Sequence, residues 1–277
     1  MRKFMCLMLL FFIFSLNVSA YTTPDEKIPV DVCVNDNIIK TDSYPFINYD
    51  TVFVPIRFVS EALGASVSWD SAGSCAQIKS GAASVTIYEG SKTAYVNGKA
   101  VSMNKSAEIR SGRLFIPVRF IAENLGANVS WDETYYSAKI YKQNTHVDKS
   151  LVDYSYTTDE ILWLAKIINA ESEGEPSAGK IGVGNVILNR VRSSDFPDTI
   201  YGVIFDRNNG VQFEPIMNGS INNTPASESF ISAKRALRGE NTVGECLYFF
   251  NPKTSTNSWI KNNRTYYTTI RNHDFYL

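Results

Sequence analysis

The sequence predicts an α+β protein with two parts, a tandem repeat of strands and short helices followed by a mainly helical domain. Residues 54–70 recur at 116–132 with a constant offset of 62, so that Trp69 corresponds to Trp131. Such self-similarity is typical of a duplicated unit. Further along the chain, apolar residues recur at the 3,4 spacing of an amphipathic helix. With 277 residues and 44% apolar content, the chain is long enough for two globular domains.

The first residues have the three parts of an export signal. Met1-Arg2-Lys3 precedes an apolar run from Phe4 to Leu16, and small residues follow up to Ala20. The apolar run is short for a membrane span, and small residues before a cleavage point are typical of a signal peptide. We therefore expect residues 1–20 to be a signal peptide and the protein to be secreted, with an uncleaved anchor as the alternative.

Residues 21–142 hold the two copies of the repeat. Each copy predicts a strand, a short helix, a strand that carries a Trp, and a turn into a further strand. Gly64 and Gly126 follow the two predicted helices, at a position where glycine commonly ends a helix. We interpret this region as a tandem α+β domain that targets or spaces whatever follows it.

An aromatic and a basic position recur together in both copies. Trp69 comes with Arg57, and Trp131 comes with Arg119. These pairs could form a sugar-binding surface, but a Trp in an alternating strand more often packs into the core, and we expect core packing. The polar, aperiodic residues 143–156 then predict a linker.

A carboxylate interrupts the apolar face of the first helix predicted after the linker. Thr157 precedes Glu160 by three residues, a capping-box spacing, and Gly174 and Pro176 end the helix. The next position on the apolar face is Glu171, after Ile161, Leu164, Ala165 and Ile168. Desolvation holds a half-buried carboxyl toward its protonated form, which is the form that a general acid needs.

The neighbouring carboxylates leave an alternative open. An acidic run at the end of a helix is more often a solvated surface than a catalytic site. On a helix, Glu171 and Glu175 could share a face while Glu173 points away. Spacing alone does not choose between the outer two.

The next predicted helix covers residues 177–192 and contains three glycines. Gly179, Gly182 and Gly184 each cost about 1 kcal/mol relative to alanine in a helix interior. Their clustering therefore predicts close backbone packing, which we expect against the helix that carries Glu171.

Two long motifs and a set of shorter ones support a family resemblance. The motifs cover residues 168–175 (INAESEGE) and 182–191 (GVGNVILNRV). Later landmarks follow in order: Phe196-Pro197-Asp198-Thr199-Ile200, Gln212-Phe213, Tyr248-Phe249-Phe250-Asn251-Pro252, Trp259 and His273-Asp274-Phe275-Tyr276. Residues 157–277 thereby resemble the SleB-like cell wall hydrolases, the spore cortex-lytic enzyme family, and residues 21–142 resemble copper amine oxidase N-terminal-like repeats. The resemblance implies a C-terminal lysozyme-like (lytic transglycosylase-like) domain with Glu171 as catalytic acid.

The same resemblance implies an activity on peptidoglycan glycan strands. Its members cleave the β-1,4 bond between N-acetylmuramic acid and N-acetylglucosamine, so we expect a lytic transglycosylase of spore cortex or cell wall. Glu171 would protonate the glycosidic oxygen. A second carboxylate, if the reaction needs one, would come from Glu173, Glu175, Asp206 or Glu214. The expected substrate-binding residues carry amide or aromatic groups: Asn189, Gln212, Phe213, Tyr248, Phe250 and Asn251. Strand alternation predicts that at most one of Phe249 and Phe250 faces a groove.

Composition argues against several other classes of protein. A net charge of −1 without a basic stripe excludes nucleic acid as the main partner. With two histidines, His146 and His273, a zinc-dependent N-acetylmuramoyl-L-alanine amidase is poorly provided with ligands, so we expect no metal and no cofactor. The amidase remains an alternative, as does a non-catalytic cell-wall-binding protein. Beyond the glycan, we expect cell-wall or spore-coat components as partners of the repeats.

The cysteines that remain after removal of the signal peptide are odd in number. They are Cys33, Cys75 and Cys246. An odd number in an exported protein does not form a disulfide framework, and we expect buried free thiols, with a Cys33–Cys75 pair as the alternative. A nucleophile pair of Cys246 with His273 is disfavoured, because a thiol that opens an apolar run is usually part of the core.

Overall fold

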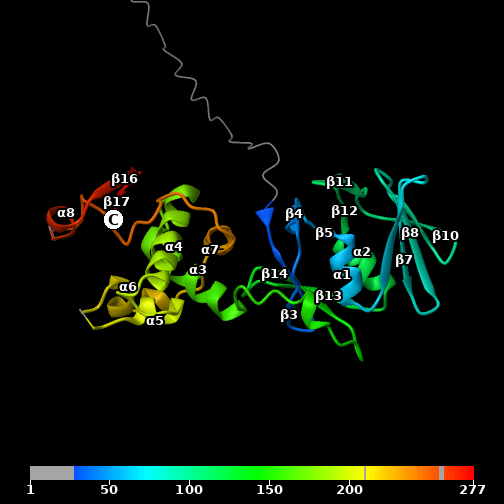
Figure 1. Cartoon of the computed structure of the whole chain (residues 1–277), viewed down its shortest axis with the longest axis horizontal. Helices are drawn as coiled ribbons and strands as arrows, with labels where there is room; N and C mark the ends of the chain where they lie inside the picture. Colours follow the sequence, from blue (N-terminus) through cyan, green and yellow to red (C-terminus); the bar gives the residue numbers. More distant parts are fainter. Residues whose placement is uncertain (1–27, 209, 256–258) are drawn as a thin grey trace, which may run out of the picture.

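The computed structural model describes residues 28–208, 210–255 and 259–277. Figure 1 shows most of the strands with the short helices α1 and α2 at one end of the molecule, and the helices α3, α4 and α7 with the strands β16 and β17 at the other. The mixed α+β class is therefore confirmed. The signal peptide predicted for residues 1–20 lies outside the described residues. Among those described, no helix combines the length and the apolar character needed to cross a membrane.

The N-terminal domain contains three sheets and two short helices within the described residues. The central sheet has the order β1-β4-β5-β12-β11, with bounds Ile28–Pro29, Phe46–Asn48, Thr51–Pro55, Arg113–Pro117 and Glu108–Arg110. The second sheet has the order β10-β9-β8-β7-β6, with bounds Lys99–Ser102, Thr93–Val96, Ala83–Tyr88, Cys75–Ser80 and Ser66–Asp70. The third has the order β13-β14-β2-β3, with bounds Asn128–Asp132, Ser137–Tyr141, Asp31–Val34 and Asn37–Ile38. The helices are α1 (Ile56–Ala62) and α2 (Val118–Asn124).

The two copies of the repeat form one intertwined unit. At the centre, β5 of the first copy pairs antiparallel with β12 of the second, and Val54 lies opposite Ile116. These two residues are equivalent under the offset of 62, so a pseudo-twofold axis passes between them. Each outer sheet also mixes the copies, because β14 pairs with β2 and β8 bridges β7 to β9.

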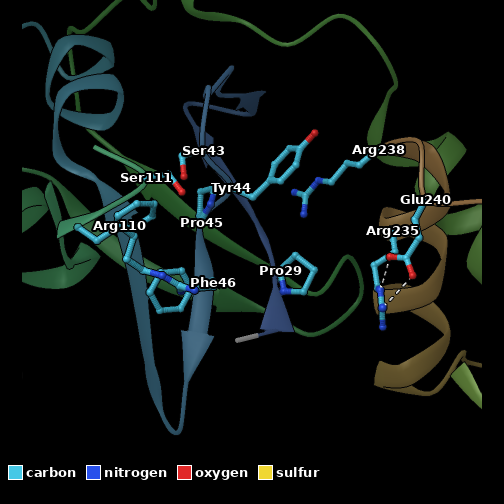
Figure 2. A pocket seen from close by; sticks show the side chains of 11 residues that line it. Pro29, Ser43, Tyr44, Pro45, Phe46, Arg110, Ser111, Arg235, Arg238 and Glu240 are labelled. Carbon is cyan, nitrogen blue, oxygen red and sulfur yellow. Dashed lines mark hydrogen bonds and ion pairs between the residues drawn. The ribbon is translucent and has the colours of Figure 1, made fainter. Parts of the chain in front are cut away.

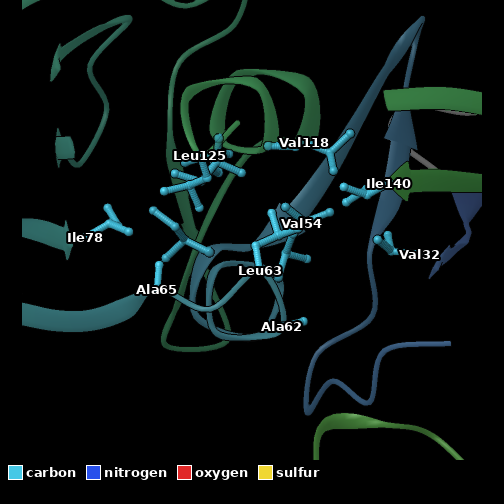
Figure 3. Packing of buried hydrophobic residues seen from close by; sticks show 14 of the residues in the cluster. Val32, Val54, Ala62, Leu63, Ala65, Ile78, Val118, Leu125 and Ile140 are labelled. Carbon is cyan, nitrogen blue, oxygen red and sulfur yellow. The ribbon is translucent and has the colours of Figure 1, made fainter. Parts of the chain in front are cut away.

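Equivalent apolar residues of both copies fill a single core. Figure 3 shows Leu63 and Leu125 among the residues of this cluster, together with Ile78 and Ile140. Gly64 and Gly126 have φ values of +81° and +79°, which a glycine adopts without strain, and both end their helices as predicted.

The tryptophans of the repeats do not both pack into the core. The Trp69 side chain is 40% exposed, and Trp131 is half-buried, with its ring edge-on to Tyr136 at 4.9 Å between centroids. The expectation of core packing is wrong for Trp69, because its strand β6 is an edge strand in which no residue is fully buried.

The segment 143–156, expected to be a linker, packs against the repeat domain. Val147 and Val152 are buried in the repeat core, and Tyr156 is buried against the following domain. Ile39 forms a β-bridge with Val152, and a short 3₁₀ helix covers Lys149–Leu151. Polar composition suggested a tether, but widely spaced apolar residues fasten the segment.

The C-terminal domain is a cluster of helices beside a small sheet. Its helices are α3 (Thr158–Ser172), α4 (Ser177–Arg192), α5 (Ile200–Phe205), α6 (Glu214–Asn218), α7 (Ser227–Leu237) and α8 (Trp259–Asn263), with a 3₁₀ turn at Ser220–Asn222. The sheet has the order β15-β17-β16, with bounds Tyr248–Phe250, His273–Tyr276 and Tyr266–Ile270.

The glycines of α4 permit the close packing that was predicted for them. A side chain at Gly184 would meet Ile168 of α3 at 3.0 Å, in agreement with the expected contact between the two helices. A side chain at Gly182 would meet Val243 at 2.8 Å and Phe275 at 3.0 Å. Gly182 therefore allows α4 to pack closely against these two residues rather than against α3.

A buried ion cluster joins the two domains. Asp31 on β2 forms ion pairs with Lys234 on α7, at 2.9 Å, and with Arg238 just after α7, at 2.7 Å. Tyr156 donates a hydrogen bond to Asp31 at 3.3 Å. Although burial alone would raise the pKa of Asp31, the positive charges of Lys234 and Arg238 lower it below its usual value. The carboxylate therefore stays ionised between the domains.

Aromatic and apolar contacts extend this interface. Figure 2 shows Tyr44 of the repeat domain beside Arg238, whose guanidinium lies 4.1 Å from the ring centroid. Cys33 and Ile38 of the repeat domain belong to the same buried cluster as the core of the helical domain. A cavity of about 470 Å³ opens at the edge of the contact. The repeats are thus fastened to the helical domain by a continuous core.

The three cysteines of the described chain are free and buried, as predicted. Burial raises the pKa of the Cys246 thiol to about 11, so this residue is a poor nucleophile near neutral pH.

Candidate active site

A cleft of about 1210 Å³ lies where the ends of α3 and α4, the start of α6 and the small sheet come together. It is the place where the helical domain gathers charged, amide and aromatic side chains. Its lining residues include Glu171, Arg190, Phe196, Asp206, Gln212, Phe213, Glu214, Tyr248, Phe249, Phe250, Asn251, Trp259, Arg264 and His273.

Glu171 lies in the last turn of α3 and lines the cleft. The helix begins with the predicted capping box, in which Thr157 and Glu160 satisfy each other's backbone N–H groups. The apolar residues on the same face are buried, which leaves Glu171 at the edge of the core. Burial, and then the negative charge of Glu214, raise the pKa of Glu171 to about 7, against the opposing charge of Arg190. The carboxyl can therefore hold a proton near neutral pH.

The other two carboxylates of the acidic run have different surroundings. Glu173 is exposed at the end of α3 and does not line the cleft. Glu175 is buried beyond the end of the helix, so it does not share a helical face with Glu171. Its carboxylate accepts a hydrogen bond from Asn272 Nδ2 at 2.8 Å and another from the Asn272 N–H at 3.4 Å. Glu175 thus holds the turn between β16 and β17.

Two of the candidates for a second carboxylate line the cleft with Glu171. Asp206 is half-buried at the end of α5, where its carboxylate accepts a hydrogen bond from the Asn208 N–H at 2.9 Å. Glu214 is exposed at the first position of α6. The structure therefore brings Asp206 and Glu214 to the site and excludes Glu173 and Glu175 from its lining.

Sequence reasoning missed Arg190, which lines the cleft from α4. Its side chain is 5% exposed and lies over the rings of Phe196, Phe213 and Tyr248, at 4.8, 5.3 and 5.5 Å from their centroids. Nε donates to the Leu247 carbonyl at 2.8 Å, whereas one terminal nitrogen has no hydrogen-bond partner among the described residues. Burial lowers the pKa of Arg190 to about 10, which still leaves it charged near neutral pH.

The expected substrate-binding residues divide into two groups. Gln212, Phe213, Tyr248, Phe250 and Asn251 all line the cleft. Asn189 does not line it, because its buried amide donates to the carbonyls of Gly244 and Cys246, both at 2.9 Å. Asn189 therefore fastens α4 to the loop before β15.

Aromatic side chains form much of the cleft wall. Tyr248 packs edge-on against Trp259 at 6.2 Å between centroids, and Arg264 donates to the Tyr248 hydroxyl at 2.8 Å. Phe249 and Phe250 both line the cleft. The expectation that at most one of them faces a groove is wrong, since β15 is a three-residue strand at the edge of the sheet.

His273 lies on β17 at the same cleft. It is buried, its ring meets Phe249 edge-on at 5.3 Å, and Nδ1 has no partner among the described residues. Burial lowers the pKa of His273, so the ring is neutral near pH 7. In the described part of the chain, no three His, Cys, Asp or Glu side chains gather as ligands for a metal ion.

Two family models match the chain, one in each domain. The copper amine oxidase N-terminal domain matches residues 33–140, and the Cell Wall Hydrolase family matches residues 174–276. Relatives of the second region include the cell wall hydrolase CwlJ of Halalkalibacterium halodurans, 34% identical over 102 residues, which are 35% of this chain and 70% of that protein. The chain belongs to the cell wall hydrolase family.

Spore cortex-lytic enzymes are further relatives. The enzyme of Bacillus cereus is 38% identical over 109 residues, which cover 39% of this chain and 41% of that protein. The chain thus spans about two fifths of the length of the spore cortex-lytic enzymes that it matches. Among solved structures, the catalytic domain of the germination-specific lytic transglycosylase SleB from Bacillus anthracis is 36% identical, with a TM-score of 0.42 over 46% of this chain and all of that one.

Proposed function

We propose that the protein is an exported lytic transglycosylase that cleaves the β-1,4 bond between N-acetylmuramic acid and N-acetylglucosamine in cell wall or spore cortex peptidoglycan. The observation that carries this proposal is the desolvated carboxyl of Glu171 at the cleft, with its pKa raised to about 7. Membership of the cell wall hydrolase family and the names of the relatives support the class of substrate.

The proposed reaction uses Glu171 twice. Its carboxyl first gives a proton to the glycosidic oxygen while the bond from that oxygen to C1 of N-acetylmuramic acid breaks through an oxocarbenium-like state. The C6 hydroxyl of the same sugar then forms a bond to C1 and returns its proton to the Glu171 carboxylate. The products are a 1,6-anhydromuramic acid end and an N-acetylglucosamine end, and no water is consumed.

The walls of the cleft fit an N-acetylated glycan. Tyr248 and Phe250 offer apolar faces, Phe213 packs beneath Arg190, and Gln212 and Asn251 offer amide groups that can pair with acetamido groups. The partnerless terminal nitrogen of Arg190 can donate to a carbonyl or carboxylate oxygen of the substrate. We assign these residues to glycan binding, and we leave Asn189 out because its amide is occupied by backbone carbonyls.

Analysis of the products tests this mechanism directly. The full-length protein is incubated with purified sacculi, and the soluble fragments are examined by mass spectrometry. Anhydro ends are lighter by one water than reducing ends, so their presence is the expected result. Reducing muramic acid ends would mean that water attacks C1, and a second carboxylate, Asp206 or Glu214, would then act as base. Free stem peptides released only in the absence of chelator would indicate a zinc amidase instead.

A further inference from the structure

The repeat domain carries two grooves built on one plan. The larger has a volume of about 600 Å³ and the smaller about 160 Å³. Every residue that lines the smaller groove has its counterpart, 62 positions away, in the lining of the larger one. The pairs include Trp69 with Trp131 and Arg57 with Arg119. The duplication has therefore preserved a surface site as well as a fold.

Each groove is assembled from both copies of the repeat. In the larger groove, residues 117–119 at the start of α2 and residues 129–131 of β13 face residues 50–52 of the first copy. In the smaller groove, residues 55–57 and 67–69 face residues 112–114 of the second copy. Because β5 and β12 pair about the pseudo-twofold axis, the intertwined fold creates both sites together.

The side chains of the grooves combine aromatic faces with fixed polar groups. Tyr49, at the rim of the larger groove, is 89% exposed, and Trp69 of the smaller is 40% exposed. Arg119 is held in place by the Val129 carbonyl at 3.1 Å and by Glu123 at 3.2 Å. An exposed aromatic ring at the rim of a groove offers a flat apolar face to a ligand.

We propose that the two grooves bind amino-sugar units of a peptidoglycan glycan strand. The apolar C–H face of a pyranose ring packs on an aromatic ring, and the Arg of each groove donates to a hydroxyl oxygen or an amide carbonyl of the sugar. The lining of the larger groove also holds the carboxylates of Asp50, Glu123 and Glu133, which can accept hydrogen bonds from sugar hydroxyl and amide N–H groups. This inference rests on the proposed function, because the same polymer would occupy the cleft and the grooves.

Because the repeats are attached rigidly to the helical domain, the two grooves can hold a glycan strand near the cleft. A strand held in one groove raises the effective concentration of its neighbouring sugars at the second groove and at the cleft. The buried cluster of Asp31, Lys234 and Arg238 fixes the grooves relative to Glu171. The repeats would therefore hold the polymer while the cleft acts on it.

Binding is measured with the full-length chain carrying Glu171→Gln, so that bound polymer is not cut. One arm uses protein-free sacculi, and the other uses glycan strands from which the stem peptides have been removed. Trp69→Ala and Trp131→Ala together should weaken binding in both arms by at least about tenfold, which corresponds to 1.4 kcal/mol. Tyr49→Ser places at this exposed position the residue found at its counterpart, Ser111, and should weaken binding with no effect on folding.

Tyr141→Ala is the matched control, because Tyr141 is 61% exposed on the same domain and lines neither groove. Unchanged binding in the Trp and Tyr49 variants would overturn the proposal, as would an equal loss in the control. Binding of intact sacculi without binding of peptide-free strands would assign the ligand to the peptides and also overturn it. Product release by the chain with an intact Glu171 is measured separately, so a failure of the grooves and a failure of the proposed reaction are distinguishable.

Discussion

Asp31 of the repeat domain and Lys234 of α7 form an ion pair of 2.9 Å across the domain interface, and their side chains are 3% and 0% exposed. Neither charge has access to water if its partner is removed. The pair therefore links the folding of one domain to that of the other.

We expect Asp31→Asn to lower the free energy of unfolding by about 3–5 kcal/mol, because it leaves the buried charges of Lys234 and Arg238 uncompensated. Chemical denaturation of the full-length protein measures the loss. Asp42→Asn is the control, since Asp42 pairs with Arg113 at an exposed site and its loss should cost less than about 1 kcal/mol. Equal effects of the two substitutions would contradict a structural role for the interface cluster.

The three carboxylates near the end of α3 should respond differently to conversion to Gln. Glu171→Gln cannot deliver a proton, so the rate should fall by at least about 10²-fold while the circular dichroism spectrum is retained. Glu173→Gln should leave the rate nearly unchanged, because Glu173 is exposed and outside the cleft. Glu175→Gln should reduce stability more than rate, because Glu175 accepts hydrogen bonds at the β16–β17 turn. Near-normal turnover by Glu171→Gln would mean that Glu171 is not the general acid.

The activity should decline as the pH rises through about 7, because the pKa of Glu171 is raised to about 7 and only the protonated form donates. A profile of kcat/KM against pH on soluble glycan strands measures this alkaline limb. Glu214→Gln removes a negative charge that raises the pKa of Glu171, so the limb should move to lower pH. An alkaline limb that stays at the same pH, or that moves to higher pH, would mean that Glu214 does not raise the pKa of Glu171.

The same carboxyl should cost stability above pH 4.5. Between the ordinary pKa of 4.5 and the folded value of about 7, the unfolded chain loses its proton first, so unfolding becomes more favourable as the pH rises. Glu171→Gln cannot ionise and should be more stable than the unsubstituted protein above pH 7, by about 1–3 kcal/mol, with no difference near pH 4. Melting temperatures at pH 4 and pH 8 measure the effect. A constant difference at both pH values, such as the exposed Glu173→Gln should give, would argue against a shifted pKa.

The position of Glu171 could be predicted because it depends on local information. A capping box fixes the start of α3, and the 3,4 spacing of apolar residues fixes the face on which the carboxyl lies. The fate of Glu175 could not be predicted in this way, because its partner Asn272 is 97 residues away. We expected Gly174 and Pro176 to end the helix, and the structure ends it at Ser172, so Glu175 lies beyond its last turn.

Arg190 was missed for a related reason. In the sequence it is a basic residue near the end of a helix, a position where solvated arginines are common. Its burial follows from the Leu247 carbonyl, 57 residues away, and from rings contributed by three separate segments. The signal that could have indicated Arg190 is its place within the family motif at residues 182–191.

The repeat was evident from the sequence, but its strand pairing was not. An offset of 62 identifies equivalent residues without saying whether each copy folds on itself or pairs with the other. The strands of the two copies pair in registers such as Val54 opposite Ile116. Equivalent residues have similar side chains, so the sequence alone does not distinguish pairing between the copies from pairing within one copy. In the same way, the polar composition of 143–156 concealed the apolar residues that fasten it.

The pairing of β2 with β14 places Val32 beside Ala138, so β2 has no ladder partner on that side until more than a hundred further residues have been made. The ion-pair partners of Asp31 are Lys234 and Arg238, which are made later still. During synthesis, the pairing of β2 with β14 and the ion pairs of Asp31 can therefore form only after the last strand of the repeat domain and α7 have been made.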